Sequence, residues 1–361
     1  MLKKVAVIIS PNWHDYAEKY IDDCLAGIRT QDYSGEIKIF ITDNETSGKS
    51  YEFLHSKLSG LIPAVEISRN KTNDGFAKGC NDSMKKALAE GSDYIFNLSI
   101  HSVMEPDCIS RLVEVAESDE KIGAVQALCL LCPEKNKILS RGNATHFLGF
   151  GYCLGYKEEL EGRPAKFCGP TENDIFYPSG GSFFLKKEIL EKVGMFDEKY
   201  WMYNEDQELG WRIWLAGYRC VLAPKAVMCS KYNFLRSISK YYWMDRNRIL
   251  AILECYQLST LILIFPAFIL MEFGLLLFSL KNGSLKEKIK VWKYFLSLKN
   301  WRYIIKARAR NQGLRQVRDR EIAKLVTGKI WYQEVGDWKL RLINPVFNAY
   351  WLFVRVLLIF L

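Results

Sequence analysis

Short apolar runs alternate with helix-like stretches through the first part of the chain, and this alternation constrains its fold more than any other feature. The apolar runs are residues 5–9, 37–42, 64–67 and 94–98, and the helix-like stretches are residues 16–29, 50–58 and 76–89. The pattern predicts an α/β fold with a parallel sheet. Ligands of such sheets bind beyond the carboxyl ends of the strands. Because Asp43, residues 73–79 and residues 99–101 fall at these ends, we expect a binding site there.

The chain changes character after residue 228, and we expect two domains, residues 1–228 and residues 229–361. Residues 259–280 are almost continuously apolar and long enough to span a bilayer, with Pro266 and Glu272 as interruptions. Glu272 would be costly inside a membrane. A helix pair that breaks at Pro266 and lies in the membrane interface is therefore an equal alternative. Residues 345–361 form a second apolar segment.

A strongly basic segment lies between these two apolar segments. Residues 281–320 contain 13 Lys and Arg against two acidic residues, whereas the whole chain has a formal net charge of +9. Trp and Tyr are interleaved with the basic residues, as in helices that lie in the plane of a membrane. The same mixture could bind nucleic acid, but the flanking apolar segments favour anionic membrane lipids. The sequence predicts an α-helical, membrane-associated C-terminal region and no nucleic-acid partner.

The ten cysteines are scattered through the predicted strands and helices, and residues 1–10 lack the features of a secretory signal. We therefore expect reduced thiols in a cytosolic setting. Cys129 and Cys132 form the only Cys-x-x-Cys pair. Without a second pair, they do not predict a zinc or redox site.

An acidic cluster precedes a helix-like run in Trp201-Met-Tyr-Asn-Glu-Asp-Gln-Glu-Leu-Gly-Trp-Arg212. The helix dipole stabilises carboxylates at a helix N-terminus, so Glu205, Asp206 and Glu208 are expected to stay ionised. An ionised carboxylate beside a pocket can act as a general base. Simple charge complementation of the helix N-terminus explains the same residues equally well.

Four elements around this cluster follow one another along the chain: Gly180-Gly181, Gly194-Met-Phe-Asp197, Glu205-Asp206 and Ala216-Gly-Tyr218. Together they resemble the second half of the inverting family 2 glycosyltransferases, and most closely the rhamnosyltransferase-like members. The resemblance implies the GT-A fold, a Rossmann-like and mostly parallel sheet flanked by helices. It also implies that Asp206 is the base that takes the proton of the acceptor hydroxyl. Glu205 would hold the loop and contact the acceptor, and Trp201 is a further candidate for that contact.

The first half of the chain extends the resemblance to a nucleotide-sugar site. Ile39-Phe-Ile-Thr-Asp-Asn-Glu-Thr-Ser47 looks like the family's strand end at which an Asp, here Asp43, contacts the base or ribose. Asn73-Asp-Gly-Phe-Ala-Lys-Gly-Cys-Asn81 looks like the family's donor loop, which assigns Asn73, Gly75 and Phe76 to the donor pocket. An Asx-turn at Asp43 and a helix cap at Asn73 are the structural alternatives.

Two positions depart from the family's pattern. Ser99-Ile-His101 stands where the family has an acidic motif that holds a divalent metal, and Ser230 stands where it often has a histidine. A Mn²⁺ or Mg²⁺ cofactor is therefore in doubt. His101 could still ligate a metal, it could be protonated and act as the cation that faces the donor phosphates, or the site could have lost catalysis. Transfer with little or no dependence on metal is the expectation that we place first.

Tyr241-Tyr-Trp-Met-Asp-Arg-Asn-Arg248 looks like the family's Tyr-x-x-Arg-Asn element. Because Arg pairs well with phosphate oxygens, Arg246 and Arg248 are candidates for binding a lipid-linked phosphate. A membrane-surface helix with solvated basic residues is the alternative. For residues 10–14 the register of the resemblance is not fixed, and we assign them no role.

The sequence as a whole predicts an inverting glycosyltransferase that moves a sugar from a nucleotide sugar to a glycan or polyprenyl-linked oligosaccharide. We expect it to act at the cytosolic face of the cell membrane. The alternative from another class is a catalytically inactive, glycosyltransferase-like subunit that binds a partner enzyme or the membrane. The altered residues 99–101 favour the inactive subunit, while the intact Glu205-Asp206 pair and donor loop favour the enzyme. The sugar, the acceptor and the oligomeric state are not predicted.

Overall fold

The computed structural model describes residues 2–12, 16–60, 64–160, 171, 173–231, 238–330 and 338–361. Its main sheet has the strand order β3-β2-β1-β4-β10-β6-β11-β5, with β7 paired to β6. The strands are β1 (Val5–Asn12), β2 (Ile37–Asn44), β3 (Val65–Asn70), β4 (Tyr94–Leu98), β5 (Ser102–Met104), β6 (Ile122–Leu131), β7 (Ile138–Ser140), β10 (Ser182–Lys186) and β11 (Arg219–Ser230). Strands β1 to β4 are mutually parallel, and β10 runs antiparallel to β4 and β6. The expected α/β fold is confirmed, and its sheet is mixed, since β5, β7 and β10 pair antiparallel with their neighbours.

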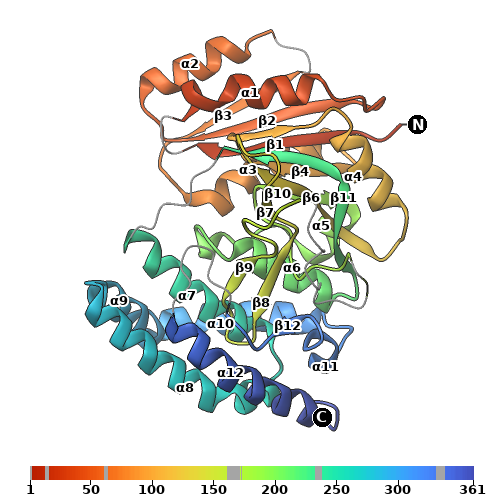
Figure 1. The fold of residues 1–361 in the computed structure, drawn as a ribbon. Helices are drawn as coiled ribbons and strands as arrows, with labels where there is room; N and C mark the ends of the chain where they lie inside the picture. The colour runs from red at the N-terminus through yellow and green to blue at the C-terminus, as the bar shows by residue number, and fades with distance from the viewer. Residues whose placement is uncertain are drawn as a thin grey trace.

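Helices cover both faces of this sheet (Figure 1). Alternate residues of β1 enter two separate apolar cores, with Ala6 and Ile8 on one face and Val5 and Val7 on the other. This alternation follows from the two-residue repeat of a strand. Residues of α3 (Gly75–Ala89), α5 (Lys187–Val193) and α6 (Glu205–Leu215) line the first core, and residues of α1 (Ala17–Arg29), α2 (Gly48–Leu58) and α4 (Cys108–Glu117) line the second.

The C-terminal part of the chain is helical and lies below the sheet in Figure 1. It comprises α7 (Ile238–Cys255), α8 (Leu258–Lys281), α9 (Leu285–Leu296), α10 (Leu298–Gly313), α11 (Asp319–Ile322) and α12 (Trp338–Leu357). It also returns one short strand, β12 (Val326–Thr327), to a small second sheet with β8 (Asn143–His146) and β9 (Gly151–Cys153). The domain boundary at residue 228 stays a prediction.

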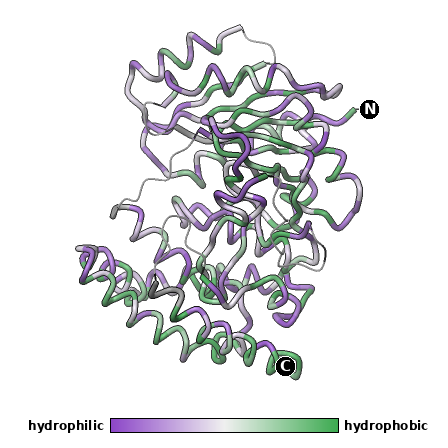
Figure 2. Tube along the Cα trace, viewed as in Figure 1, coloured by the Kyte–Doolittle hydropathy of each residue, from purple (hydrophilic) through white to green (hydrophobic). Residues whose placement is uncertain are grey.

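Helix α8 is one continuous helix with Pro266 inside it, so the alternative of a helix pair that breaks at this proline is wrong. It is long and apolar enough to cross a membrane, and only 17% of its most apolar window is buried. Its buried residues, Thr260, Ile264, Ala267, Met271 and Ser279, recur at helical spacing and therefore share one face. Large apolar side chains are exposed elsewhere on α8 and on α12, and Figure 2 shows both helices as mostly hydrophobic.

Glu272 of α8 lies in a buried ion-pair network instead of facing an apolar environment. One of its oxygens pairs with Arg248 of α7, and the other lies 2.7 Å from the Lys288 Nζ of α9. The Trp292 indole N–H donates to the same carboxylate at 3.1 Å. The network explains how an otherwise apolar helix tolerates an acidic residue, because a buried charge needs partners and hydrogen bonds.

A disulfide joins Cys132 and Cys229, which contradicts the expectation that all thiols are reduced. Strands β6 and β11 pair in parallel, and this register brings the two residues together although 97 positions separate them in the sequence. Five further cysteines keep free thiols, namely Cys24, Cys108, Cys129, Cys220 and Cys255. Cys129, the other half of the Cys-x-x-Cys pair, is one of these.

Candidate active site

The acidic pair Glu205-Asp206 begins helix α6 and packs against the loop before β10, with Glu205 buried and Asp206 half-buried. Asp206 Oδ2 accepts a hydrogen bond from the Gly180 backbone N–H at 2.8 Å, and its Oδ1 accepts one from the Gln207 N–H at 2.8 Å. Within the described part of the chain, Glu205 Oε2 is buried and has no hydrogen-bond partner. One carboxyl group is thus held by backbone donors, while its neighbour retains unused hydrogen-bonding capacity.

Burial changes the protonation of both groups. Desolvation raises the pKa of Asp206 to about 6, although hydrogen bonds from Gly180 and Gln207 oppose this shift. Desolvation and the adjacent Asp206 raise the pKa of Glu205 well above its usual range. The expectation that both stay ionised is therefore wrong for Glu205, because the cost of burying charge exceeds the stabilisation by the helix dipole. At neutral pH, Asp206 is mostly ionised and is a stronger base than an exposed aspartate.

Glu208, the third acid of the cluster, has a different environment. It is buried, and its carboxylate accepts hydrogen bonds from the Arg212 Nε at 2.8 and 3.0 Å. Arg310 and Asn311 of α10 donate to its Oε1 at 3.1 and 3.0 Å. Glu208 thus joins the sheet domain to the C-terminal helices and is fully engaged in structural contacts.

The segment that leads into the acidic pair touches the predicted donor loop. Trp201 O accepts a hydrogen bond from the Ala77 N–H at 3.2 Å. The Trp201 side chain lies over Gly75, where a Cβ atom would come within 2.5 Å of it. Gly75 also has a φ of +87°, so this position favours glycine for both reasons. Trp201 stacks in turn on Trp243 of α7, with ring centroids 4.6 Å apart.

The donor loop is shaped by asparagine side chains at the ends of β2 and β3. Asn73 Oδ1 accepts from the Gly75 N–H at 3.1 Å, and Asn44 Nδ2 donates to Gly75 O at 2.9 Å. Phe76 packs beside Gly180, where a Cβ atom would lie 3.2 Å from its ring. Gly180 is also the donor to Asp206, so the donor loop and the acidic pair lie on either side of one glycine.

Asp43 lies buried at the carboxyl end of β2, next to Asn12 of β1 and Arg69 of β3 in the strand register. Its Oδ1 is 3.2 Å from the Arg69 Nε, and the Thr46 hydroxyl donates to its Oδ2. Sequence reasoning missed Arg69, although its place at the end of a strand was a usable signal. The arginine also lies over the Tyr51 ring at 4.4 Å, which makes a cation and an aromatic face adjacent to Asp43.

Ser99 and His101 lie at the end of β4, as the strand pattern predicts. The Ser99 N–H donates to Gly181 O at 3.1 Å, which places Ser99 against the loop that holds Asp206. Burial lowers the pKa of His101 to about 4, and its ring meets the Tyr20 ring edge-on at 6.1 Å. In the protein alone the imidazole is therefore neutral at pH 7. For His101 to act as a cation, the two phosphates of a bound donor would have to raise this pKa.

The side chains around His101 decide whether the protein alone can coordinate a divalent metal ion. No group of three or more His, Cys, Asp or Glu side chains is arranged to hold a metal ion among the residues that the structure describes. The described side chains therefore do not form a metal site of their own, since Mn²⁺ and Mg²⁺ prefer several oxygen ligands.

Arg246 and Arg248 are buried on α7, and this placement does not fit the expected binding of a lipid phosphate. Arg246 Nη2 donates to Lys199 O at 2.7 Å and to Tyr200 O at 3.1 Å. Arg248 pairs with Asp245 at 2.6 Å and with Glu272. Both guanidinium groups are engaged within the protein, because α7 packs against α6, α9 and α10 and this packing buries the face that carries them.

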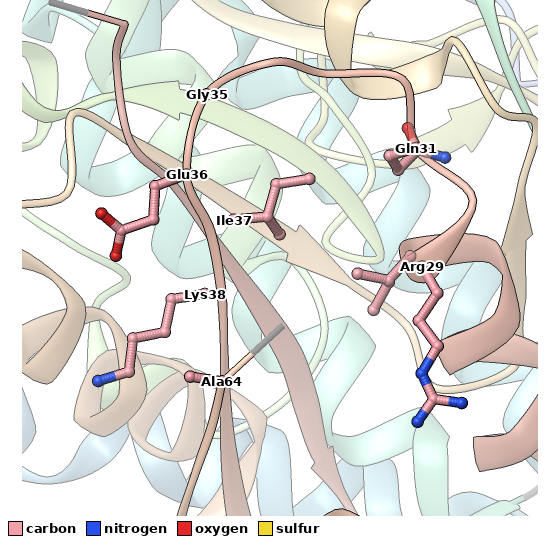
Figure 3. A pocket seen from close by; sticks show the side chains of 8 residues that line it. Arg29, Gln31, Gly35, Glu36, Ile37, Lys38 and Ala64 are labelled. Atoms are coloured by element: carbon pink, nitrogen blue, oxygen red, sulfur yellow. The ribbon is translucent and has the colours of Figure 1, made fainter. Parts of the chain in front are cut away.

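Two hollows flank the sheet domain, and only one adjoins these residues. The first, of about 430 Å³, lies at the amino ends of β2 and β3 beside Arg29, Gly35 and Lys38, away from the acidic pair (Figure 3). The second, of about 390 Å³, is lined by Asn73, Asp74, Lys78, Asp197, Glu198, Lys199 and Trp201. The second hollow therefore opens beside the donor loop and the segment before the acidic pair.

One protein family and several relatives match this sequence. The family described as "Glycosyl transferase family 2" matches residues 7–194, more than half of the 361-residue chain. The poly-beta-1,6-N-acetyl-D-glucosamine synthase of Staphylococcus aureus (strain COL) is 25% identical over 209 residues, which cover 58% of this chain and 46% of the synthase. An N-acetylglucosaminyltransferase of Mesorhizobium japonicum is 21% identical over 232 residues, covering 61% of this chain and 50% of its own. The chain thus spans about half the length of these relatives.

Two solved structures share the fold. The structure of GalNAc-T7 with UDP, GalNAc and Mn²⁺ has a TM-score of 0.52 and 15% identity, covering 70% of this chain and 48% of that one. S. aureus TarS has a TM-score of 0.50 and 14% identity, covering 96% of this chain and 52% of that one. The expected GT-A-type α/β fold is confirmed, while the rhamnosyltransferase-like subgroup stays a prediction. The chain therefore belongs to glycosyl transferase family 2.

Proposed function

We propose that this protein is an inverting glycosyltransferase in which Asp206 is the catalytic base. The observation that carries the proposal is the position of Asp206, a half-buried carboxylate held by Gly180 N–H and separated by that glycine from Phe76 of the donor loop. A base with a pKa near 6 suits proton transfer at neutral pH. A carboxylate base beside the donor loop can remove the proton of the acceptor hydroxyl, which sugar transfer with inversion requires.

In the proposed reaction, Asp206 takes the proton of an acceptor hydroxyl as that oxygen attacks the anomeric carbon of the donor sugar. The bond between that carbon and the nucleoside diphosphate breaks on the opposite face, and the configuration is inverted. Protonated Glu205 can donate a hydrogen bond to the acceptor, because its Oε2 is not engaged elsewhere among the described residues. Trp201, beside the second hollow, supplies an aromatic face for the acceptor.

The nucleotide part of the donor is assigned to the ends of β2, β3 and β4. Asp43 and Arg69 would bind the base and ribose, and Asn73, Gly75 and Phe76 would line the sugar side of the pocket. Ser99 and neutral His101 would lie nearest the diphosphate, where preorganised hydrogen-bond donors stabilise the leaving group. The names of the two relatives point to an N-acetylhexosamine donor, and a hexosyl or rhamnosyl donor is the wider class.

We propose a glycan or polyprenyl-linked acceptor at the cytosolic face of a membrane. The exposed apolar side chains of α8 and α12 support this placement, as does the basic segment that α9 and α10 carry. Apolar contact and attraction to anionic lipid act together in such segments. The acceptor would then reach Asp206 from the membrane side.

The membrane placement predicts that the protein floats with vesicles that contain anionic lipid and that high salt weakens the association. We expect Phe265→Glu and Ile269→Glu, both at exposed positions on α8, to reduce flotation. Leu2→Glu is the matched control, because Leu2 is also more than half exposed but lies far from α8 along the chain. Flotation that is equal for all three variants would contradict the placement.

The rival function is an inactive subunit, and the altered residues 99–101 favour it. A turnover assay distinguishes the two, using detergent-solubilised protein, UDP-, GDP- and dTDP-sugars, and a membrane-lipid extract as acceptor source. Each donor is tested with Mn²⁺ and with EDTA. We expect turnover that survives EDTA, because the described donor atoms form no metal site. Turnover only with Mn²⁺ would make His101 an unusual ligand, and no turnover with any donor and acceptor would favour the inactive subunit.

A further inference from the structure

The segment between Tyr200 and Glu205 adopts a backbone conformation that needs external support. Trp201, Tyr203 and Asn204 have φ values of 61°, 69° and 63°, in the left-handed region that non-glycine residues rarely adopt. Each such residue costs free energy and persists only where the surroundings enforce it. Three within four positions, directly before the acidic pair, indicate that other parts of the protein hold this loop.

One side chain from α7 holds the loop. The Asn247 Nδ2 group lies within hydrogen-bond distance of three carbonyl oxygens of the loop, Tyr200 O at 2.9 Å, Met202 O at 2.9 Å and Tyr203 O at 2.6 Å. Because the amide has two N–H bonds, one of them is shared between two of these oxygens. Asn247 is fully buried, so water does not compete for these carbonyl groups. A single amide thus gathers the carbonyls of the strained segment and fixes its path.

Arg246 fixes the orientation of that amide. Its Nε and Nη2 donate to Asn247 Oδ1 at 2.8 and 2.6 Å, which leaves the Nδ2 end to face the loop. Its Nη2 also donates to Lys199 O, at the start of the same loop. Together the two side chains provide donors to the backbone of residues 199–203.

The loop that Asn247 holds connects the two halves of the candidate site. At one end it carries Trp201, which covers Gly75 and accepts a hydrogen bond from the Ala77 N–H at the donor loop. At the other end Asn204 precedes Glu205 and Asp206 at the start of α6. A shift of this loop would therefore move the base and the donor loop relative to each other.

We propose that Asn247 is a positioning residue that sets the distance between Asp206 and the donor loop through the backbone of residues 200–203. This inference rests on the proposed role of Asp206 as the base. It also gives the family's Arg-Asn element in this chain a task that differs from phosphate binding. Asn247 acts on the reaction only through the loop and contacts no reacting atom.

The test compares Asn247→Ala and Asn247→Asp with Tyr241→Phe as the control. The control lies on the same helix, and its hydroxyl contacts Ser279 of α8 at 2.9 Å instead of the loop. We expect both Asn247 variants to lower kcat about 100-fold, the effect of misplacing a reacting group by about 1 Å. Asp removes the amide donors and turns an anion toward three carbonyl oxygens, so it should not rescue the function.

Two readouts separate positioning from simple destabilisation. The first is hydrogen exchange. The backbone amides of residues 200–204 should exchange faster in both Asn247 variants, and their exchange rates should be unchanged in the control. The second is the acid limb of the pH–rate profile, which should move below pH 6 because water that reaches Asp206 lowers its pKa. The charge of Asp206 also raises the pKa values of Glu205 and Tyr177. Arg246→Lys, a milder change that loses the paired donation to Asn247, should give an intermediate shift of the profile.

Unchanged exchange at residues 200–204 in Asn247→Ala would overturn the inference, and this measurement needs no catalytic activity. A lower kcat with an unchanged acid limb would also overturn it, because the loss would then not come from the position of Asp206. If Asn247→Ala does not fold, Arg246→Lys supplies the same two readouts. Absence of turnover in the unsubstituted protein would instead count against the proposed function. Hydrogen exchange would then still decide whether Asn247 holds the loop.

Discussion

Replacement of Asp206 by asparagine should lower kcat by about 10³-fold, within the range that general bases contribute. Asparagine has nearly the same size but no basic oxygen, so the acceptor hydroxyl would keep its proton during attack. Binding of the nucleoside diphosphate should persist, because the residues assigned to it lie at the ends of β2, β3 and β4. The measurement is single-turnover kinetics with the best donor, together with calorimetric titration of the free nucleotide.

The pH dependence of the unsubstituted enzyme gives an independent check on Asp206. Burial raises its pKa to about 6, so kcat/KM should fall as the pH drops through 6 and the base becomes protonated. An exposed aspartate would place this limb about two units lower. The limb should be absent from the residual activity of Asp206→Asn.

The same shift determines how Asp206 affects stability. A carboxyl group whose pKa is higher in the folded than in the unfolded protein binds its proton more tightly when folded. The free energy of unfolding therefore falls as the pH rises from about 4 to about 6. Asp206→Asn removes this loss but also sacrifices one of two backbone hydrogen bonds, and these effects oppose each other. We expect a thermal midpoint within a few degrees of the parent, so a large drop would contradict a purely catalytic role.

The central features of the fold could be predicted because they depend on local patterns. The four apolar runs became β1 to β4, and the three helix-like stretches became α1 to α3, with boundaries that moved by a few residues. Helix α2, for example, begins two residues early because the Ser47 hydroxyl accepts from Ser50 N–H at 3.2 Å and caps it. The carboxyl ends of parallel strands share one edge, so Asp43, Asn73 and Ser99 could be assigned to one side of the sheet from the pattern alone.

The features that could not be predicted depend on contacts between distant segments. The protonation of Glu205 follows from burial that the helix-start pattern does not reveal. The pairing of Cys132 with Cys229 follows from the register of β6 and β11. The sequence makes Arg248 a candidate phosphate ligand although Asp245 lies three positions before it, because its second acidic partner, Glu272, lies 24 positions away on another helix. In each case the residue can be read from the sequence, but the residues that surround it are known only from the fold.

Replacement of Glu208 by glutamine should greatly lower the free energy of unfolding, whereas Asp206→Asn should mainly lower kcat. Glu208 is fully buried and accepts hydrogen bonds from Arg212, Arg310 and Asn311. Glutamine would leave the buried Arg212 without its counter-charge and would direct an amide N–H₂ group toward other donors. Breaking a buried ion pair in this way costs about 3–5 kcal/mol.

The measurement is the free energy of unfolding from urea titration, with Glu114→Gln as the control. Glu114 also pairs with an arginine on its own helix, Arg111 at 2.9 Å, but both side chains are exposed, so we expect a change below about 1 kcal/mol. A loss below about 1 kcal/mol for Glu208→Gln as well would contradict the structural role of Glu208. Because Arg310 and Asn311 belong to α10, a large loss would further indicate that the sheet domain and the C-terminal helices unfold together. Two acids only two positions apart on α6 would then serve separate purposes, Asp206 in the reaction and Glu208 in joining the two parts of the chain.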